Sequence, residues 1–222
     1  GEHALTTAPP ERVLAVLDDA SVARALLDAS CALAQLVQRE LQLVYVENAA
    51  ALAAAALPAT RVLAQAANAW TPLAPEDVER GWRAQAARLR AQAERATARH
   101  PVNWSMRVTR GALHQTVLDL CGETDLLLVA AAPAHAAPAD APLKRAPVCA
   151  LDDGSAAGQE AVRLAGSLAQ ALGAPLRVFR IDGQPGLPRL GSARLVVAPA
   201  LRLSAPAVAE LRVPLLLVGT PA

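Results

Sequence analysis

The stretches LAVLDDAS at Leu14–Ser21 and CALDDGS at Cys149–Ser155 repeat one pattern in the two halves of the chain. In both, an apolar run ends in Leu-Asp-Asp, and a small residue and a serine follow. A short apolar run closed by acids is typical of a buried strand. Asp and Ser are preferred residues at the start of a helix, where their side chains accept hydrogen bonds from free backbone N–H groups. The repeat therefore predicts two strand-to-helix turns.

Each of these turns belongs to a strand–helix–strand unit. In the first unit, the strand-forming segments Arg12–Leu17 and Leu41–Asn48 flank an apolar stripe at helical spacing. In the second unit, Pro147–Leu151 and Pro175–Asp182 flank a matching stripe, which ends before Gly173. Parallel strands joined by a helix form a right-handed crossover. The pattern predicts an α/β fold with open parallel sheets.

The second half reads as an abridged copy of the first. The first half continues with a long helix, a strand, a short helix and a strand, predicted at Pro75–Arg99, Asn103–Thr109, Gln115–Cys121 and Leu126–Ala131. The second half continues with a loop, a strand, a short helix and a strand, predicted at Gly183–Ser192, Ala193–Ala200, Pro206–Glu210 and Val213–Thr220. The first half lacks a final strand, so the closing strand can end either sheet. We predict domains at 1–131 and 147–222, joined by a Pro- and Ala-rich linker at 132–146.

The composition excludes several classes of protein. Hydrophobic residues make up 54% of the chain and the formal net charge is +1, which excludes a disordered chain and provides no field to attract nucleic acid. The three cysteines lack CxxC spacing, which argues against zinc or a disulfide framework. The longest apolar stretch, Ala49–Leu57, is too short to span a bilayer, and no signal peptide is evident. We expect a cytoplasmic protein with no membrane insertion in this segment.

The predicted helix Pro75–Arg99 is rich in arginine, which is one way to build a nucleic-acid surface. Glu79 and Glu94 interleave with the arginines, while Val78, Trp82 and other apolar residues form one stripe. Mixed charge opposite an apolar stripe is typical of a solvated outer face. We therefore expect a surface helix and no nucleic-acid partner.

The acids that follow each first strand occupy the place where open α/β sheets bind ligands. In the second copy, Gly154 lets the backbone approach a ligand and Ser155 begins a helix with free N–H groups. The neighbouring carboxylates would repel a phosphate, so hydrogen bonds to a ribose or a base are favoured. The alternative is that these Asp and Ser side chains only cap helices. The candidate ligand-facing residues are Asp18, Asp152, Gly154 and Ser155.

The order of these elements resembles the universal stress protein family. The resemblance rests on LDD(A/G)S after the first strand, a second strand ending in an acid, a strand closed by RG, and DLLLVA. It implies tandem Rossmann-like domains of the adenine nucleotide alpha hydrolase type, with the second domain shortened. It also implies contact between an adenine nucleotide and the acid that ends the first strand, here Asp18 and Asp152.

The chain departs from the family at the phosphate-binding loop. Nucleotide-binding members have the glycine signature G-x2-G-x9-G-(S/T) after the fourth strand. The corresponding segments here, AAPAHAAPADAPLKR and PALRLSAPAVAEL, contain no glycine. Such a loop uses converging backbone N–H groups to hold phosphates. We therefore expect no cofactor held in the usual way, and the alternative is ATP or AMP in a non-standard site of the first domain.

The candidate nucleophiles and metal ligands do not form a catalytic pattern. Ser21 and Ser155 lack the G-x-S-x-G elbow. The four histidines, His3, His100, His114 and His135, have no metal-ligand spacing. We expect a non-catalytic regulatory binding module of the stress response, with a protein partner or a second copy of itself. A soluble regulatory domain of a transporter is the remaining alternative.

Overall fold

The computed structural model describes residues 12–58, 60–64, 69–124, 126–130, 146–181, 190, 193–200 and 213–219. Three predicted features fall wholly or mostly outside these residues: the linker at 132–146, the loop Gly183–Ser192 and the short helix Pro206–Glu210. His3 and His135 also lie outside them.

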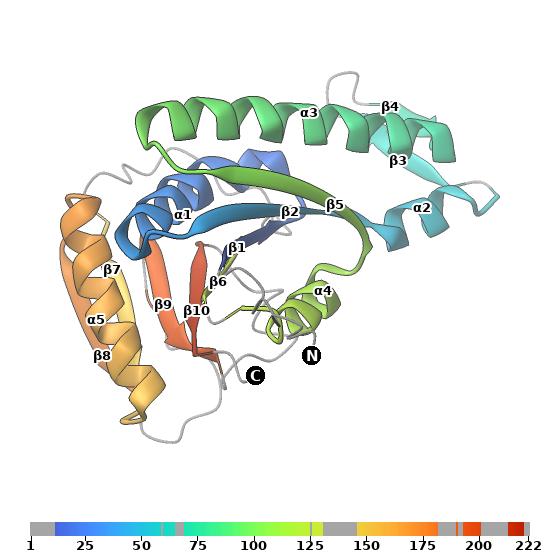
Figure 1. The fold of residues 1–222 in the computed structure, drawn as a ribbon. Helices are drawn as coiled ribbons and strands as arrows, with labels where there is room; N and C mark the ends of the chain where they lie inside the picture. The colour runs from blue at the N-terminus through green and yellow to red at the C-terminus, as the bar shows by residue number, and fades with distance from the viewer. Residues whose placement is uncertain are drawn as a thin grey trace, which may run out of the picture.

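One mixed sheet runs through both halves of the chain (Figure 1). Its eight strands lie in the order β5-β2-β1-β6-β10-β9-β7-β8. Their bounds are β1 Arg12–Leu17, β2 Glu40–Asn48, β5 Trp104–Gly111, β6 Leu126–Ala130, β7 Val148–Asp152, β8 Leu176–Arg180, β9 Leu195–Pro199 and β10 Leu215–Val218. All neighbours in this sheet pair in parallel except β6 and β10. The predicted α/β, Rossmann-like fold class is confirmed.

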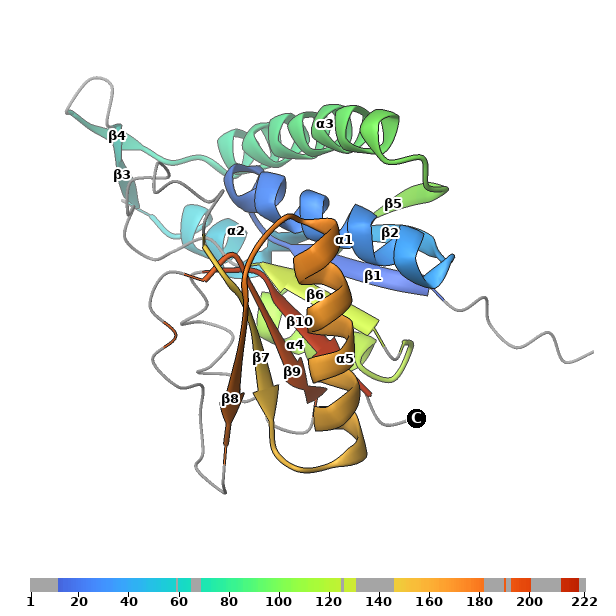
Figure 2. The ribbon, with the colours of Figure 1, turned by 90° about the vertical axis from the view of Figure 1, so that its left-hand side faces the viewer.

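Helices cover both faces of this sheet. The helices α1 (Ala23–Val37), α3 (Pro75–Arg99) and α5 (Ala156–Ala171) share one core cluster with Val13, Ala15 and Leu17 of β1. The alternate β1 residues, Leu14 and Val16, pack with the short helix α4 (Leu113–Leu120) on the other face. Strands covered on both faces consist of continuous apolar runs. This explains why β1 and β6 could be predicted from the sequence. Figure 2 shows α5 lying along β7 and β9.

Three elements lie in a segment for which the sequence predicted none. After β2 come α2 (Ala49–Ala55) and an antiparallel pair, β3 (Arg61–Ala64) and β4 (Ala69–Pro72), which forms a separate two-stranded sheet. In this pair the side chains of Val62 and Trp70 are exposed. Figure 1 shows the pair standing away from the main sheet, beside the start of α3.

The segment Ala20–Val37 is long and apolar enough to cross a membrane by length and composition, with a mean hydropathy of 1.3. It is longer than Ala49–Leu57, which was identified from the sequence as the longest apolar stretch. In the fold this segment contains the core helix α1, whose Leu26, Leu27 and Leu33 are fully buried against the sheet. Burial in a protein core requires the same apolar composition as burial in lipid.

The last strand joins the two halves. β10 pairs in parallel with β9 and antiparallel with β6, where Leu215 lies opposite Val129 and Val218 lies opposite Leu126. The closing strand, which the sequence left free to end either sheet, therefore contacts both. The strands of the predicted domains 1–131 and 147–222 lie in one continuous sheet, while the boundaries of those domains stay a prediction.

Candidate functional site

The two repeated turns lie at opposite ends of the strands, because β1 and β7 run in opposite directions. β1 and β6 run in one direction, and β10, β9 and β7 run in the other, because the β6–β10 pairing is antiparallel. Asp18 follows the carboxyl end of β1, and Asp152 ends β7. The structure therefore does not bring the predicted site residues of the two halves together, and each turn is a separate candidate site.

The second turn forms a closed set of hydrogen bonds. Asp152 Oδ1 accepts from the Gly154 N–H at 2.9 Å, and Asp153 Oδ1 accepts from the Ser155 N–H at 3.1 Å and from its hydroxyl at 2.5 Å. The Ser155 hydroxyl in turn accepts from the Gly158 N–H at 3.0 Å, which confirms Ser155 as the cap of α5. Gly154 has a φ of +77°, a conformation that glycine adopts without steric cost. These four hydrogen bonds hold the turn in shape, and Asp152 Oδ2 also lies 3.9 Å from Nε of Arg180 in β8.

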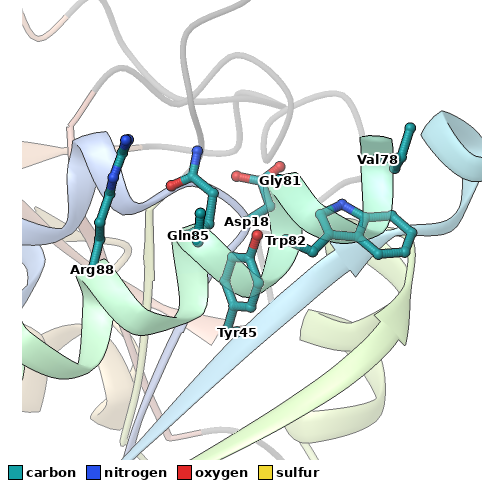
Figure 3. A pocket seen from close by; sticks show the side chains of 8 residues that line it. Asp18, Tyr45, Val78, Gly81, Trp82, Gln85 and Arg88 are labelled. Atoms are coloured by element: carbon teal, nitrogen blue, oxygen red, sulfur yellow. The ribbon is translucent and has the colours of Figure 1, made fainter. Parts of the chain in front are cut away.

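The first turn leaves one carboxylate facing a cavity. Asp19 is the cap here, because its Oδ1 accepts from the Ser21 N–H at 2.7 Å. Asp18 lines an open pocket of about 350 Å³ between the carboxyl end of the sheet and α3 (Figure 3). The other lining residues are Tyr45 of β2 and Val78, Gly81, Trp82, Ala84, Gln85 and Arg88 of α3.

Polar groups of different kinds face this pocket. Tyr45 rises from β2 with its hydroxyl toward Asp18 (Figure 3). Burial, followed by the charges of Glu47, Asp19 and Asp18, raises the pKa of Tyr45 to about 12, so its hydroxyl stays protonated at neutral pH. The Gln85 side-chain oxygen accepts from the Ala20 N–H at 3.1 Å and so ties α3 to the turn. Tyr45, Trp82, Gln85 and Arg88 were not among the predicted site residues.

An ion pair holds the aromatic part of the lining in place. Arg110, at the end of β5, donates from Nε and Nη2 to Glu47 Oε2 at 3.2 and 3.1 Å. Its guanidinium carbon lies 5.0 Å from the centre of a Trp82 ring, a cation–π distance. Glu79 of α3 lies 3.9 Å from the same arginine. These contacts connect β2, β5 and α3, and they fix Trp82 beside the pocket.

Replacing Arg110 with alanine is expected to lower the free energy of unfolding by about 1 kcal/mol, because it removes the cation–π contact and the partner of the Glu47 carboxylate, which is only 17% exposed. Urea denaturation followed by tryptophan fluorescence measures the change. Arg107→Ala is the control, because Arg107 pairs with Glu123 at 3.4 Å at the surface and its loss is expected to cost under about 0.5 kcal/mol. Equal losses of unfolding free energy in the two variants would contradict the inference that Arg110 fixes Trp82 beside the pocket.

The remaining candidate groups of the sequence lie apart from one another. His100 contacts Gln35 through Nδ1 at 3.2 Å, and His114 lies in α4. Cys31 and Cys149 are buried and Cys121 is partly buried; all three are free thiols. Within the described ranges, no group of three or more His, Cys, Asp or Glu residues is placed to hold a metal ion.

A second pocket, of about 420 Å³, lies at the amino ends of β2 and β5. It is lined by Gln35, Arg39, Glu40 and Asn103 among others, and it contains none of the predicted site residues. Of these two pockets, the one at Asp18 joins a predicted site residue to a cavity at the carboxyl ends of the strands, where parallel α/β sheets bind ligands.

No family model matches the sequence, and no curated protein matches it. Among solved structures, a universal stress protein from Archaeoglobus fulgidus DSM 4304 is similar, with 9% identity, a TM-score of 0.42, and coverage of 93% of this chain and 98% of that chain. A universal stress protein in complex with cAMP is similar with 15% identity, a TM-score of 0.31, and coverage of 78% and 99%. The likeness concerns the fold, and the family membership that the sequence suggests stays a prediction.

Proposed function

We propose that the chain is a non-catalytic regulatory binding module, built as a tandem variant of the universal stress protein design. The observation on which this rests is the difference between the two repeated turns. Asp18 faces an open pocket, whereas Asp152, Asp153 and Ser155 hold the turn before α5 together. The first half therefore supplies the binding site, and the second half completes the sheet that supports it.

The chemistry of the described side chains favours binding over catalysis. Burial raises the pKa of each thiol, and the pKa of Cys31 reaches about 11 because the charge of Asp28 adds to desolvation. Protonated, enclosed thiols are poor nucleophiles. Unpaired cysteines suit a reducing compartment, so we place the module in the cytoplasm, where it acts on a protein partner or as a homodimer.

The pocket is a poor match to a nucleotide triphosphate. Its lining includes the Asp18 carboxylate, and the negative charges around Tyr45 would repel a phosphate. Arg88 is the one cation among its lining residues. A nucleotide held at this site would need to place its base or ribose at Asp18 and its phosphates outside.

The test is the nucleotide content of freshly purified protein, measured by chromatography after denaturation, together with incubation in ATP. We expect substoichiometric ATP and AMP, no thermal stabilisation by millimolar ATP, and no formation of ADP. Stoichiometric AMP or ATP that is lost in Asp18→Asn would replace this proposal with the nucleotide-binding alternative. Formation of ADP that is lost in Asp18→Asn would overturn the non-catalytic assignment.

A further inference from the structure

Gly81 lies within the 25-residue helix α3, where neither the backbone nor the packing requires a glycine. Glycine is among the least favourable residues inside a helix. The described residues with a positive φ do not include Gly81. A Cβ built on Gly81 has no atom within 4 Å, so an alanine would fit at this position without a clash. The missing side chain leaves open space and has no structural use within the described part of the chain.

The space at Gly81 belongs to the pocket at Asp18. Gly81, Gln85 and Arg88 follow one another along the face of α3 that lines the pocket, with Asp18 and Tyr45 opposite (Figure 3). A side chain at position 81 would project from this face and fill part of the cavity. The absence of a side chain keeps the pocket open for a molecule that approaches the α3 backbone.

Groups of opposite charge line this pocket at different points along α3. The Asp18 carboxylate and the Tyr45 hydroxyl lie midway along the row of lining side chains (Figure 3), and the negative charge of Glu47, Asp19 and Asp18 acts on that hydroxyl. At one end of this row, beyond Gln85, lies the exposed guanidinium of Arg88, which makes no ion pair with any residue that the structure describes. Helical side chains lean toward the helix N-terminus, which brings Arg88 back toward Gln85.

We propose that this pocket binds a small zwitterion of the amino-acid class, with its ammonium group at Asp18 and Tyr45, its carboxylate at Arg88, and its body in the space left by Gly81. The inference rests on the proposed function and names the ligand class of the same site. Asp18 also takes part in another interaction within the protein. A carboxylate offers about four acceptor positions, so an ammonium group can be added to that interaction.

The probes are L-leucine, 4-aminobutyrate and 6-aminohexanoate, which separate the two charges by increasing lengths. Isothermal titration calorimetry of the whole chain is expected to detect binding of at least one of them. Asp18→Asn and Arg88→Gln are each expected to weaken that binding by about tenfold or more, since each removes a charge-assisted hydrogen bond. Arg83→Gln is the matched control, because Arg83 is an exposed arginine of α3 outside the pocket, and it is expected to leave binding unchanged.

Gly81 provides a test in which stability and binding change in opposite directions. Gly81→Ala is expected to raise the thermal midpoint by about 2–4 °C, and Gly81→Leu is expected to abolish binding of the same probe while the protein stays folded. Gly166→Ala in α5 is the control, since its Cβ would meet Leu176 at an ordinary 3.9 Å. It is expected to raise the midpoint without changing binding.

Three outcomes would overturn the inference: no probe binds, Gly81→Leu binds as the wild type does, or Arg83→Gln weakens binding as much as Arg88→Gln. None of these outcomes contradicts the proposed function, provided that ATP is neither bound nor hydrolysed. Formation of ADP sensitive to Asp18→Asn would overturn the proposed function, whatever the amino acids do. The two failures are therefore distinguishable.

Discussion

Replacing Leu216 with alanine is expected to lower the free energy of unfolding by about 2–5 kcal/mol and to weaken both halves of the chain together. Leu216 is fully buried in β10, where it lies opposite Leu128 of β6 and pairs with Val197 of β9. All three side chains belong to the same core cluster. A cavity at this position therefore removes packing from the strand that joins the two halves.

The three tryptophans separate the two halves in this experiment. Trp70, Trp82 and Trp104 all lie in the first half, so their fluorescence reports on that half, while far-UV circular dichroism reports on the whole chain. We expect the urea transitions from both probes to move together in Leu216→Ala. Leu176→Ala is the control, because Leu176 is 40% exposed on the edge strand β8, and its cost is expected to stay under about 1 kcal/mol.

Independent domains would give a different result. If residues 1–131 and 147–222 unfold separately, Leu216→Ala shifts the dichroism of the second half and leaves the tryptophan transition in place. Coincident transitions would instead mean that the β6–β10 pairing makes the chain one cooperative unit. The same experiment therefore tests the domain division predicted from the sequence.

Local patterns in the sequence predicted the parts of the fold that depend on a few neighbouring residues. One short segment is enough to predict each of these features: the apolar runs of β1 and β7, the Ser155 cap, and the glycine that follows α5. That glycine, Gly173, has the φ of +60° expected of a helix-ending glycine. The boundaries shifted by one or two residues, as helix and strand ends do.

The location of the site depends on contacts between residues far apart in the sequence, and the sequence did not predict it. Because β6 and β10 pair antiparallel, Asp18 and Asp152 lie at opposite ends of the sheet's strands. No local pattern encodes the direction of that pairing. The pocket forms because α3 packs against the turn after β1 and against β5, which places Trp82 and Arg88 in the same lining as Tyr45 of β2. One signal was available in the sequence: Gly81 interrupts an otherwise strong helical pattern, where a glycine costs about 1 kcal/mol relative to alanine.

Gly158→Ala is expected to lower the free energy of unfolding by about 1–3 kcal/mol, although alanine is the better helix former by about 1 kcal/mol. A Cβ on Gly158 would lie 2.5 Å from Asp153 Oδ1, 2.9 Å from the Asp153 backbone nitrogen and 3.1 Å from Asp152 Oδ1. The carboxylates can rotate away, but the backbone atom moves only if the whole turn moves. The clash therefore outweighs the gain in helix propensity.

Urea denaturation followed by far-UV circular dichroism measures this loss, and Gly166→Ala in the same helix is the control that is expected to stabilise the protein instead. The comparison decides between two functions of the second turn. A loss in Gly158→Ala means that the turn is closed tightly around its own cap, as its hydrogen bonds indicate. An unchanged or increased stability would mean that the turn opens at little cost, and Asp152, Gly154 and Ser155 would then return as candidates for a second ligand site.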